Sequence, residues 1–298
     1  MKPKLIVICG PTATGKSDLA VQIAKKFKGE IISADSRQIY KGLDIGSGKI
    51  TKKEMRGITH HMLDISSPKN IFTVHDFQKQ TQKIIQQILN RNRFPIICGG
   101  TGFYIQSIVD GIVLPDVPPN WKLRKDLEKK SNTKLFKILL RLDPMRAKTI
   151  DQNNPRRLIR AIEIAKKLGK VPKLNKNLTI YRKVLIGLDC SPEELKRRIK
   201  KRLIKRINQG MIKEVKNLHQ NGLSWKRLFS FGLEYRYISL YLQEKISRKE
   251  MIEKLNNEIW HYAKRQRTWF RKDKKIKWFD SSKKTTEKKI TNLIKRFI

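Results

Sequence analysis

Residues 10–17 read GPTATGKS, a glycine-rich loop of the pattern GxxxxGK[ST]. The loop follows the apolar run at 4–9 and precedes residues with helical apolar spacing, which is the strand–loop–helix context that this pattern requires. Its glycines allow a tight turn that aims backbone N–H groups at phosphate oxygens, Lys16 adds a positive charge, and the Ser17 hydroxyl can ligate magnesium. We therefore predict a phosphate-binding loop; the alternative is a fortuitous Gly-rich turn.

The loop indicates a ligand class and leaves the reaction open. A nucleoside triphosphatase or kinase needs an apolar strand that ends in a carboxylate for its metal. The run EIISADS at 30–36 contains Asp35 but comes early in the chain for that role, and FPIICGGTG at 94–102 ends on glycines and Thr101 without a carboxylate. These runs support ATP hydrolysis only weakly.

Composition points to a polyanionic partner. The 298 residues contain 68 Lys and Arg against 26 Asp and Glu, a formal charge of +42 that spreads along most of the chain. Such an excess favours nucleic acid, with compositional drift toward lysine and adhesion to an anionic membrane as alternatives. The three cysteines are far apart in or beside apolar runs, which is typical of buried thiols in a reducing compartment. The N-terminal apolar run is too short for a signal peptide or membrane span, so we expect a cytoplasmic protein.

The order of the elements predicts an α/β core with a helical insertion. Strand-like runs alternate with helical patterns in the first third, which implies a parallel sheet whose ligand lies at the carboxyl ends of the strands. The loops at 10–17, 35–40 and 99–104 follow such ends and should converge. A proline-rich break at 114–120 precedes a basic helical stretch, and strand-like residues return at 181–189. We predict a core of 1–114 and 182–298 and an insertion of 115–181.

Several blocks together resemble one family, the tRNA dimethylallyltransferases, which are P-loop enzymes that prenylate an adenosine beside the anticodon. The blocks are GPTATGKS, ISADSRQIYKGLDIGSGK (32–49), HHMLDI (60–65), GGTGFY (99–104), NNPRRLIRAIEI (153–164) and YAKRQRTWFR (262–271). The chain departs from the family pattern at Ser47-Gly48, where Thr-Ala is usual, at Asn154, where Asp is frequent, and at Glu234, where Gly is common. The resemblance implies a P-loop NTPase-like core with a parallel sheet flanked by helices.

The resemblance also implies a reaction and its site. The enzyme would transfer the dimethylallyl group from dimethylallyl diphosphate to the exocyclic amine of adenosine 37 of tRNA and release diphosphate, with Mg²⁺ at Ser17. Asp35 would be the general base and Thr101 would donate to the bridging oxygen of the diphosphate. The diphosphate would be held by Gly10, Pro11, Thr12, Ala13, Thr14, Gly15, Lys16, Ser17 and Arg202.

Contacts with the anticodon stem-loop are likewise implied by the resemblance, because the target base has to leave its stack to reach Asp35. The implied tRNA-binding residues are Asp35, Ser36, Arg37, Gln38, Thr101, Arg124, Arg156, Arg157, Leu158, Ile159, Arg160, Phe231, Gly232, Leu233, Glu234, Tyr235 and Arg236. The basic insertion would bind the stem. Arg198, Arg202 and Arg206 have four-residue spacing on another basic helix, and this stripe is either part of the site or a face exposed to solvent.

Alternative interpretations remain at this stage. Asp35 in ADS could be only a turn or N-cap residue, and Trp269 and Phe270 are expected in the core rather than as platforms for bases. His60, His61 and Asp64 fit no standard zinc pattern and suggest a structural role. The rival functions are a P-loop kinase, an adenylate isopentenyltransferase acting on free nucleotides, and a non-catalytic RNA-binding protein. We expect a monomer, because no dimer seam is evident.

Overall fold

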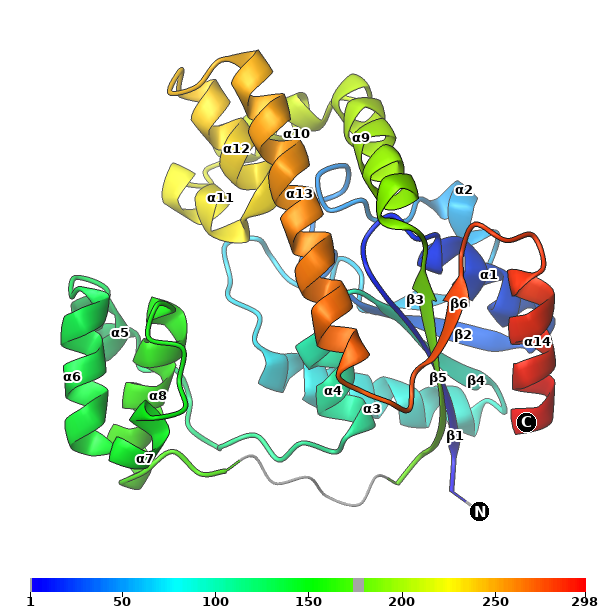
Figure 1. Ribbon diagram of the computed structural model, residues 1–298, viewed down its shortest axis with the longest axis horizontal. Helices are drawn as coiled ribbons and strands as arrows, with labels where there is room; N and C mark the ends of the chain where they lie inside the picture. Colours follow the sequence, from blue (N-terminus) through cyan, green and yellow to red (C-terminus); the bar gives the residue numbers. More distant parts are fainter. Residues whose placement is uncertain (1, 174–179) are drawn as a thin grey trace. The chain divides into compact units, whose positions relative to one another are not determined.

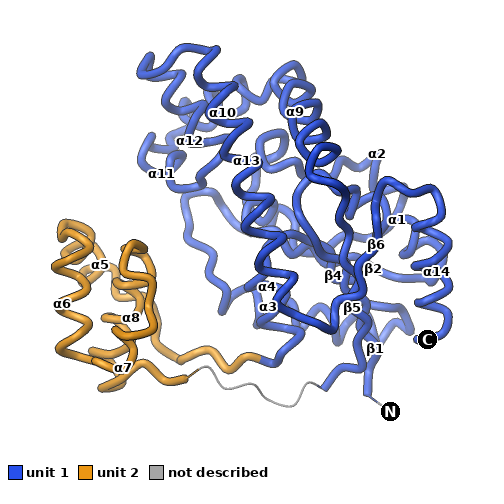
Figure 2. Tube along the Cα trace, viewed as in Figure 1, with its two compact units in different colours: residues 1–111, 178–298 blue, residues 112–177 orange. Residues whose placement is uncertain are grey.

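The computed structural model describes residues 2–173 and 180–298, which form two compact units (Figures 1 and 2). Unit 1 comprises residues 1–111 and 178–298, and unit 2 comprises residues 112–177. The insertion predicted from the sequence spanned 115–181; its residues 174–179 lie outside the described residues. Each unit is described by itself.

Unit 1 is built on a six-stranded parallel sheet with the order β3-β2-β4-β1-β5-β6. The strands are β1 (Lys4–Cys9), β2 (Gly29–Ala34), β3 (His60–His61), β4 (Phe94–Gly99), β5 (Arg182–Asp189) and β6 (Lys277–Asp280). Strand β1 lies between β4 and β5, so both its edges are hydrogen-bonded, and because helices cover both faces of the sheet its apolar run is continuous rather than alternating. The parallel sheet predicted from the strand–helix alternation is confirmed.

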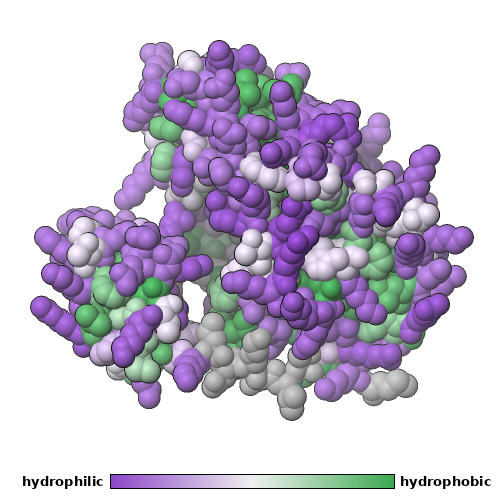
Figure 3. Space-filling view, in the orientation of Figure 1, coloured by the Kyte–Doolittle hydropathy of each residue, from purple (hydrophilic) through white to green (hydrophobic). Residues whose placement is uncertain are grey.

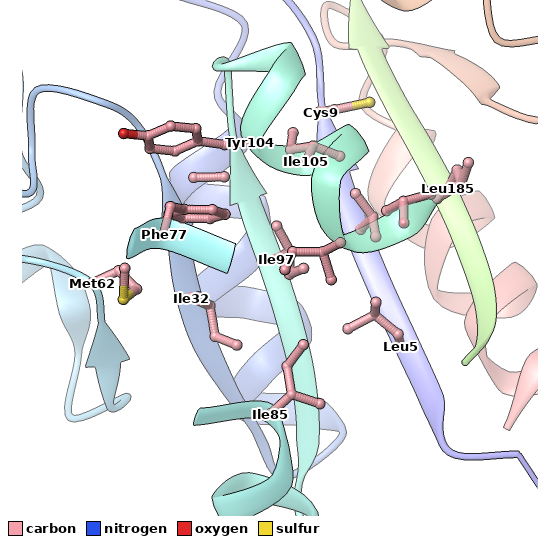
Figure 4. Packing of buried hydrophobic residues seen from close by; sticks show 14 of the residues in the cluster. Leu5, Cys9, Ile32, Met62, Phe77, Ile85, Ile97, Tyr104, Ile105 and Leu185 are labelled. Atoms are coloured by element: carbon pink, nitrogen blue, oxygen red, sulfur yellow. The ribbon is translucent and has the colours of Figure 1, made fainter. Parts of the chain in front are cut away.

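Helices cover both faces of this sheet. On one face, α1 (Lys16–Lys26) and α14 (Thr286–Phe297) pack their apolar residues against the strands. On the other face lie α3 (Val74–Asn90), α4 (Gly102–Val109) and the last turn of the long helix α13 (Arg248–Arg271). Figure 4 shows Phe77, Ile85 and Tyr104 of the cluster on this face, to which Phe270 of α13 also belongs. The short α2 (Lys52–Met55) follows β2. The core therefore has the P-loop NTPase-like arrangement that was expected.

A helical layer adjoins the sheet within unit 1 (Figure 1). Its members are α9 (Pro192–Asn208), α10 (Met211–Gln220), α11 (Trp225–Phe231), α12 (Leu233–Leu242) and α13 (Arg248–Arg271). Helix α13 begins in the core of this layer, with Met251 and Leu255 buried there, and ends with Phe270 in the core beside the sheet. One rigid helix thus connects the two cores.

Unit 2 is a small helical body with a core of its own. It contains α5 (Trp121–Leu127), α6 (Asn132–Leu142), α7 (Pro144–Ala147) and α8 (Pro155–Leu168). Helix α8 begins where the Asn154 side chain accepts from the Arg157 N–H and Pro155 stands in the first turn. Gly169, with φ +79°, ends it.

Three further expectations can be compared with the structure. Cys9, Cys98 and Cys190 are buried free thiols, as predicted. Phe270 is 3% exposed and belongs to the core, but the same expectation is wrong for Trp269, which is 38% exposed and packs its edge against Gly102 and Phe103. Hydrophilic residues dominate the surface in Figure 3. In the part of the chain that the structure describes, no helix has the length and apolar character needed to span a membrane.

We predict that Phe77→Ala destabilises unit 1 by about 3–5 kcal/mol, the usual cost of emptying an aromatic core site. Phe77 is fully buried, and its ring stacks on Tyr104 with centroids 4.1 Å apart. Urea unfolding followed by tryptophan fluorescence would measure the change, with Ile71→Ala as the control because Ile71 is 50% exposed. Equal losses in the two variants would contradict the assigned core.

Candidate active site at the carboxyl ends of the strands

The phosphate-loop geometry depends on backbone conformations that glycine permits. Gly10 leaves β1 with φ +136°, and a Cβ there would lie 2.2 Å from the Leu188 carbonyl oxygen, so no other residue fits. Gly15 has φ +81° and stands at the N-terminus of α1. The Thr14 hydroxyl and the Lys16 ammonium both donate to the Pro11 carbonyl, at 2.9 and 2.6 Å. The predicted loop is therefore closed over the helix N-terminus, where anions bind.

Two cations face this loop in partly desolvated positions. Burial lowers the pKa of Lys16 to about 8. The Arg202 guanidinium, from α9, donates to the Thr12 hydroxyl at 3.2 Å, and burial together with the charge of Arg206 lowers the pKa of Arg202 to about 10. Desolvated like charges are unfavourable unless an anion joins them, so these groups are suited to bind a strongly negative ligand.

Asp35 follows β2; one of its carboxylate oxygens stabilises a turn, and the other takes no part in that turn. Its Oδ1 accepts from the backbone N–H groups of Arg37 and Gln38 at 2.8 and 3.4 Å. Within the described residues, its second oxygen makes no hydrogen bond in this structure. The turn interpretation is thus correct for one oxygen, while the other remains available to accept a proton.

Thr101 joins the Asp35 loop to the end of β4. It occupies the N-cap position of α4, but its hydroxyl makes no capping bond and accepts from the Ser36 N–H at 3.1 Å. Its own N–H donates to the Ala34 carbonyl at 3.1 Å. The loops after β2 and β4 therefore converge as predicted, and the Thr101 proton can point to another acceptor.

One cavity of about 470 Å³ connects the phosphate loop with Asp35. The loop contributes residues 12–17, and Gln38, Gly48 and Gly99 line the side nearer the strand ends. Basic residues of α9, including Arg202, line it from the helical layer, and Tyr262 and Gln266 line it from α13. An anion on the phosphate loop and a second ligand group beside Asp35 would thus share one cavity.

Gln266 is a site residue that the sequence analysis missed. Its side chain is 6% exposed; Oε1 accepts from the Thr12 N–H and Nε2 donates to the Gly100 carbonyl, both at 2.9 Å. One amide therefore ties α13 to the loops after β1 and β4. The available signal was a polar residue at a buried helical position between Ala263 and Phe270.

Glu214 is a second residue that the sequence analysis missed. From α10 its carboxylate accepts from three consecutive N–H groups, those of Asp44, Ile45 and Gly46, at 3.1, 2.6 and 3.0 Å. It also accepts from the Tyr235 hydroxyl at 3.0 Å. These bonds hold the turn that brings Gly48 to the cavity wall, and no local motif marks Glu214 because its partners are distant in sequence.

The residues at 231–236 lie next to the Asp35 loop. Arg37 Nε donates to the Phe231 carbonyl at 2.6 Å, which joins the two segments. Phe231 and Tyr235 are buried in the core, and Arg236 stacks on the exposed Phe229 ring, 4.6 Å from its centroid. These positions therefore differ in what they can offer a ligand: the two aromatic residues support the fold, Glu234 is paired with Arg206, and Arg236 lies against the Phe229 ring.

In unit 2, a buried carboxylate organises the basic residues expected to bind tRNA. Glu163, 2% exposed, accepts from Arg124 in a two-bond fork and pairs with Arg160. Arg156 and Arg157 are exposed, and Arg157 lies 3.9 Å from Asp151. Leu158 and Ile159 are buried in the core of the unit, so their side chains present no surface to a ligand.

The two adjacent histidines point to different partners. His60 Nδ1 lies 2.8 Å from the Ile58 carbonyl, and His61 Nε2 lies 2.7 Å from Glu30 Oε2. Among the residues the structure describes, no group of three or more His, Cys, Asp or Glu side chains is placed to hold a metal ion. Ser17 is exposed at the start of α1 and lines the cavity, so a metal there would take most of its ligands from the substrate and water.

Comparison with known proteins identifies the family. Residues 38–273 match the family model of IPP transferase. The chain is 41% identical to the tRNA dimethylallyltransferase of Anoxybacillus flavithermus, an alignment that covers 100% of this chain and 97% of the relative. It is 45% identical to tRNA dimethylallyltransferase 2 of Treponema denticola, with 92% and 93% covered.

Solved structures of similar proteins point to the same family. The tRNA isopentenylpyrophosphate transferase of Bacillus halodurans superposes with a TM-score of 0.76 at 36% identity and covers 99% of this chain and 97% of its own. A eukaryotic dimethylallyltransferase acting on tRNA gives a TM-score of 0.82 at 27% identity, with 98% and 78% covered. With the phosphate loop and Asp35 lining one cavity and the match running along nearly the whole chain, this protein belongs to the IPP transferase family of tRNA dimethylallyltransferases.

Proposed function

We propose that this protein transfers the dimethylallyl group from dimethylallyl diphosphate to the exocyclic amine of adenosine 37 in tRNA and releases diphosphate. The observation that carries the proposal is the single cavity that contains both the phosphate loop and Asp35. A diphosphate on the loop and an adenine beside Asp35 would have their reacting atoms in one space.

The phosphate loop binds the leaving group in this proposal. As the allylic carbon–oxygen bond breaks, negative charge grows on the diphosphate, and donors already aimed at that charge lower the barrier. Lys16, Arg202 and the N–H groups at the start of α1 supply them. No phosphoryl group is transferred, which accounts for the missing carboxylate at the end of β4.

Magnesium fits this site through oxygen ligands. The Ser17 hydroxyl lines the cavity beside Asp18, and both offer the hard oxygen atoms that Mg²⁺ prefers. Bound there, the ion would add positive charge to the diphosphate-binding loop.

Asp35 accepts the proton of the attacking amine. An aromatic amine is a weak nucleophile, so its nitrogen attacks the allylic carbon while a proton passes to the carboxylate, and the electrons of the carbon–oxygen bond leave with the diphosphate. The oxygen of Asp35 that makes no bond within the turn supports this role. Thr101 donates to the bridging oxygen of the diphosphate.

The acceptor is tRNA, bound through its anticodon stem-loop. The charge of +42 favours a polyanion, and adenosine 37 flips out of its stack to enter the cavity. In unit 2, Glu163 orients Arg124 and Arg160, and exposed Arg156 and Arg157 add charge for the phosphates of the stem. In unit 1, residues 35–38, Thr101 and Arg236 contact the anticodon loop.

The protein acts as a monomer in the cytoplasm in this proposal. The phosphate loop, Asp35 and Thr101 all come from one chain, so the site needs no second copy. The free cysteines suit a reducing compartment.

The test is prenyl transfer from dimethylallyl diphosphate, with magnesium, to unmodified tRNA that carries adenosine 37, read by nucleoside mass spectrometry. We expect prenyl-adenosine in the tRNA reaction and none with AMP. Product from AMP alone would indicate an adenylate isopentenyltransferase, and ATP consumption without prenyl donor would indicate a kinase.

We predict that Asp35→Ala lowers turnover by a factor of about 10²–10⁴, the range for loss of a general base, while diphosphate binding stays within about twofold. The physical reason is that Asp35 touches the amine and not the leaving group. Single-turnover kinetics and calorimetry with inorganic pyrophosphate would separate the two effects. If turnover fell less than about threefold, Asp35 would not be the base.

Pyrophosphate affinity should also depend on pH through Lys16. With a pKa of about 8, Lys16 is charged below that pH and neutral above it, so affinity decreases as pH rises through about 8. The decrease approaches about tenfold per pH unit, since one proton is linked to binding. Lys16→Met is the control, because its pH profile lacks the ionisation of Lys16; identical profiles would contradict the assignment.

A further inference from the structure

Arg202 and Arg206, one turn apart on α9, meet at Gly48. A Cβ on Gly48 would lie 2.4 Å from an NH2 atom of Arg202 and 1.4 Å from that of Arg206, and Gly48 has φ +63°. Any larger residue would therefore have to displace the Arg206 guanidinium. Gly48 is kept in place because Glu214 holds the turn before it and Gln38 Nε2 donates to its carbonyl at 3.2 Å.

The two guanidinium groups have different partners although they share this corner. Arg202 donates to Thr12 of the phosphate loop and lines the cavity. Arg206 pairs with Glu234 at 3.3 Å, both side chains 12% exposed, and among the described residues neither of them lines the cavity. Glu234 thus draws one of two adjacent cations away from the loop.

Electrostatics supports a coupled arrangement. Burial raises the pKa of the Glu234 carboxyl, and the charge of Arg206 opposes that rise. Two guanidinium groups side by side repel each other, and a carboxylate on one of them relieves the repulsion. Positions 48 and 234 are also two places where the chain departs from the family pattern, and the structure puts both against Arg206.

We propose that Glu234 is a positioning residue that holds Arg206 off the phosphate loop, so that the diphosphate meets one guanidinium, Arg202, instead of two. The inference rests on the proposed function, since it concerns the same diphosphate site. Its consequence is weaker retention of the product: a second guanidinium on pyrophosphate would add a charge-assisted hydrogen bond and slow its release. Glu234 was expected among the tRNA contacts, and this role differs from that one.

The experiment is calorimetry with inorganic pyrophosphate and magnesium chloride on the full chain, together with steady-state kinetics. Glu234→Gln should bind pyrophosphate about tenfold more tightly, the effect expected of one added charge-assisted hydrogen bond. The KM for dimethylallyl diphosphate and kcat should both fall, whereas the KM for tRNA should stay within about twofold. Glu253→Gln, which removes an exposed carboxylate of α13, should change none of these values.

A double-variant cycle separates this role from a structural one. Glu234→Gln combined with Arg206→Met removes both partners and should return pyrophosphate affinity to within about twofold of the unaltered protein. That variant removes both charges of the pair, so neither is left without its partner, and it serves if Glu234→Gln alone folds poorly.

Three results would overturn the inference. One is unchanged pyrophosphate affinity in Glu234→Gln accompanied by a lower melting temperature, which would mean a structural pair only. Another is a raised KM for tRNA at constant pyrophosphate affinity, which would make Glu234 an RNA contact. Absence of pyrophosphate binding by the unaltered protein would instead overturn the proposed diphosphate site, and this inference with it.

Discussion

The parallel pairing of β2, β4 and β1 is the constraint on which the site depends. Because these strands are neighbours and run the same way, the loops that follow them leave the same edge of the sheet. The phosphate loop, Asp35 and Thr101 are therefore brought together by backbone hydrogen bonds, before any side chain of the site contributes. A register or order change in these strands would separate the phosphate loop from Asp35.

The helical layer adds side chains to the cavity at the carboxyl edge of the sheet. Helix α9 brings guanidinium groups to the phosphate loop, and Gln266 of α13 fastens that loop to the segment after β4. Since α13 is buried in both cores of unit 1, the position of Gln266 is coupled to the packing of the whole unit. The site is thus preorganised by apolar burial some distance from the chemistry.

Exposed and partly buried cations have different roles in this protein. Exposed lysines and arginines give a long-range field suited to a polyanion, whereas a few partly buried cations are matched to individual carboxylates. Glu163 in unit 2 and Glu234 in unit 1 are such partners, and each orients arginines that a count of charges treats as free.

The sequence by itself determined the phosphate loop, the alternating strands and helices, the caps of α8 and the family, because these follow from local backbone requirements and from spacing within short blocks. It also marked Asp35 and Thr101 as residues at strand ends. Only the tertiary structure decided that Gln266 bridges two loops, that Glu214 holds the turn before Gly48, and that Glu234 pairs with Arg206. These contacts join residues from 28 to 254 positions apart, and no local sequence pattern encodes contacts over such separations. The tertiary structure also leaves Trp269 exposed, although its spacing along the helix resembles that of core residues.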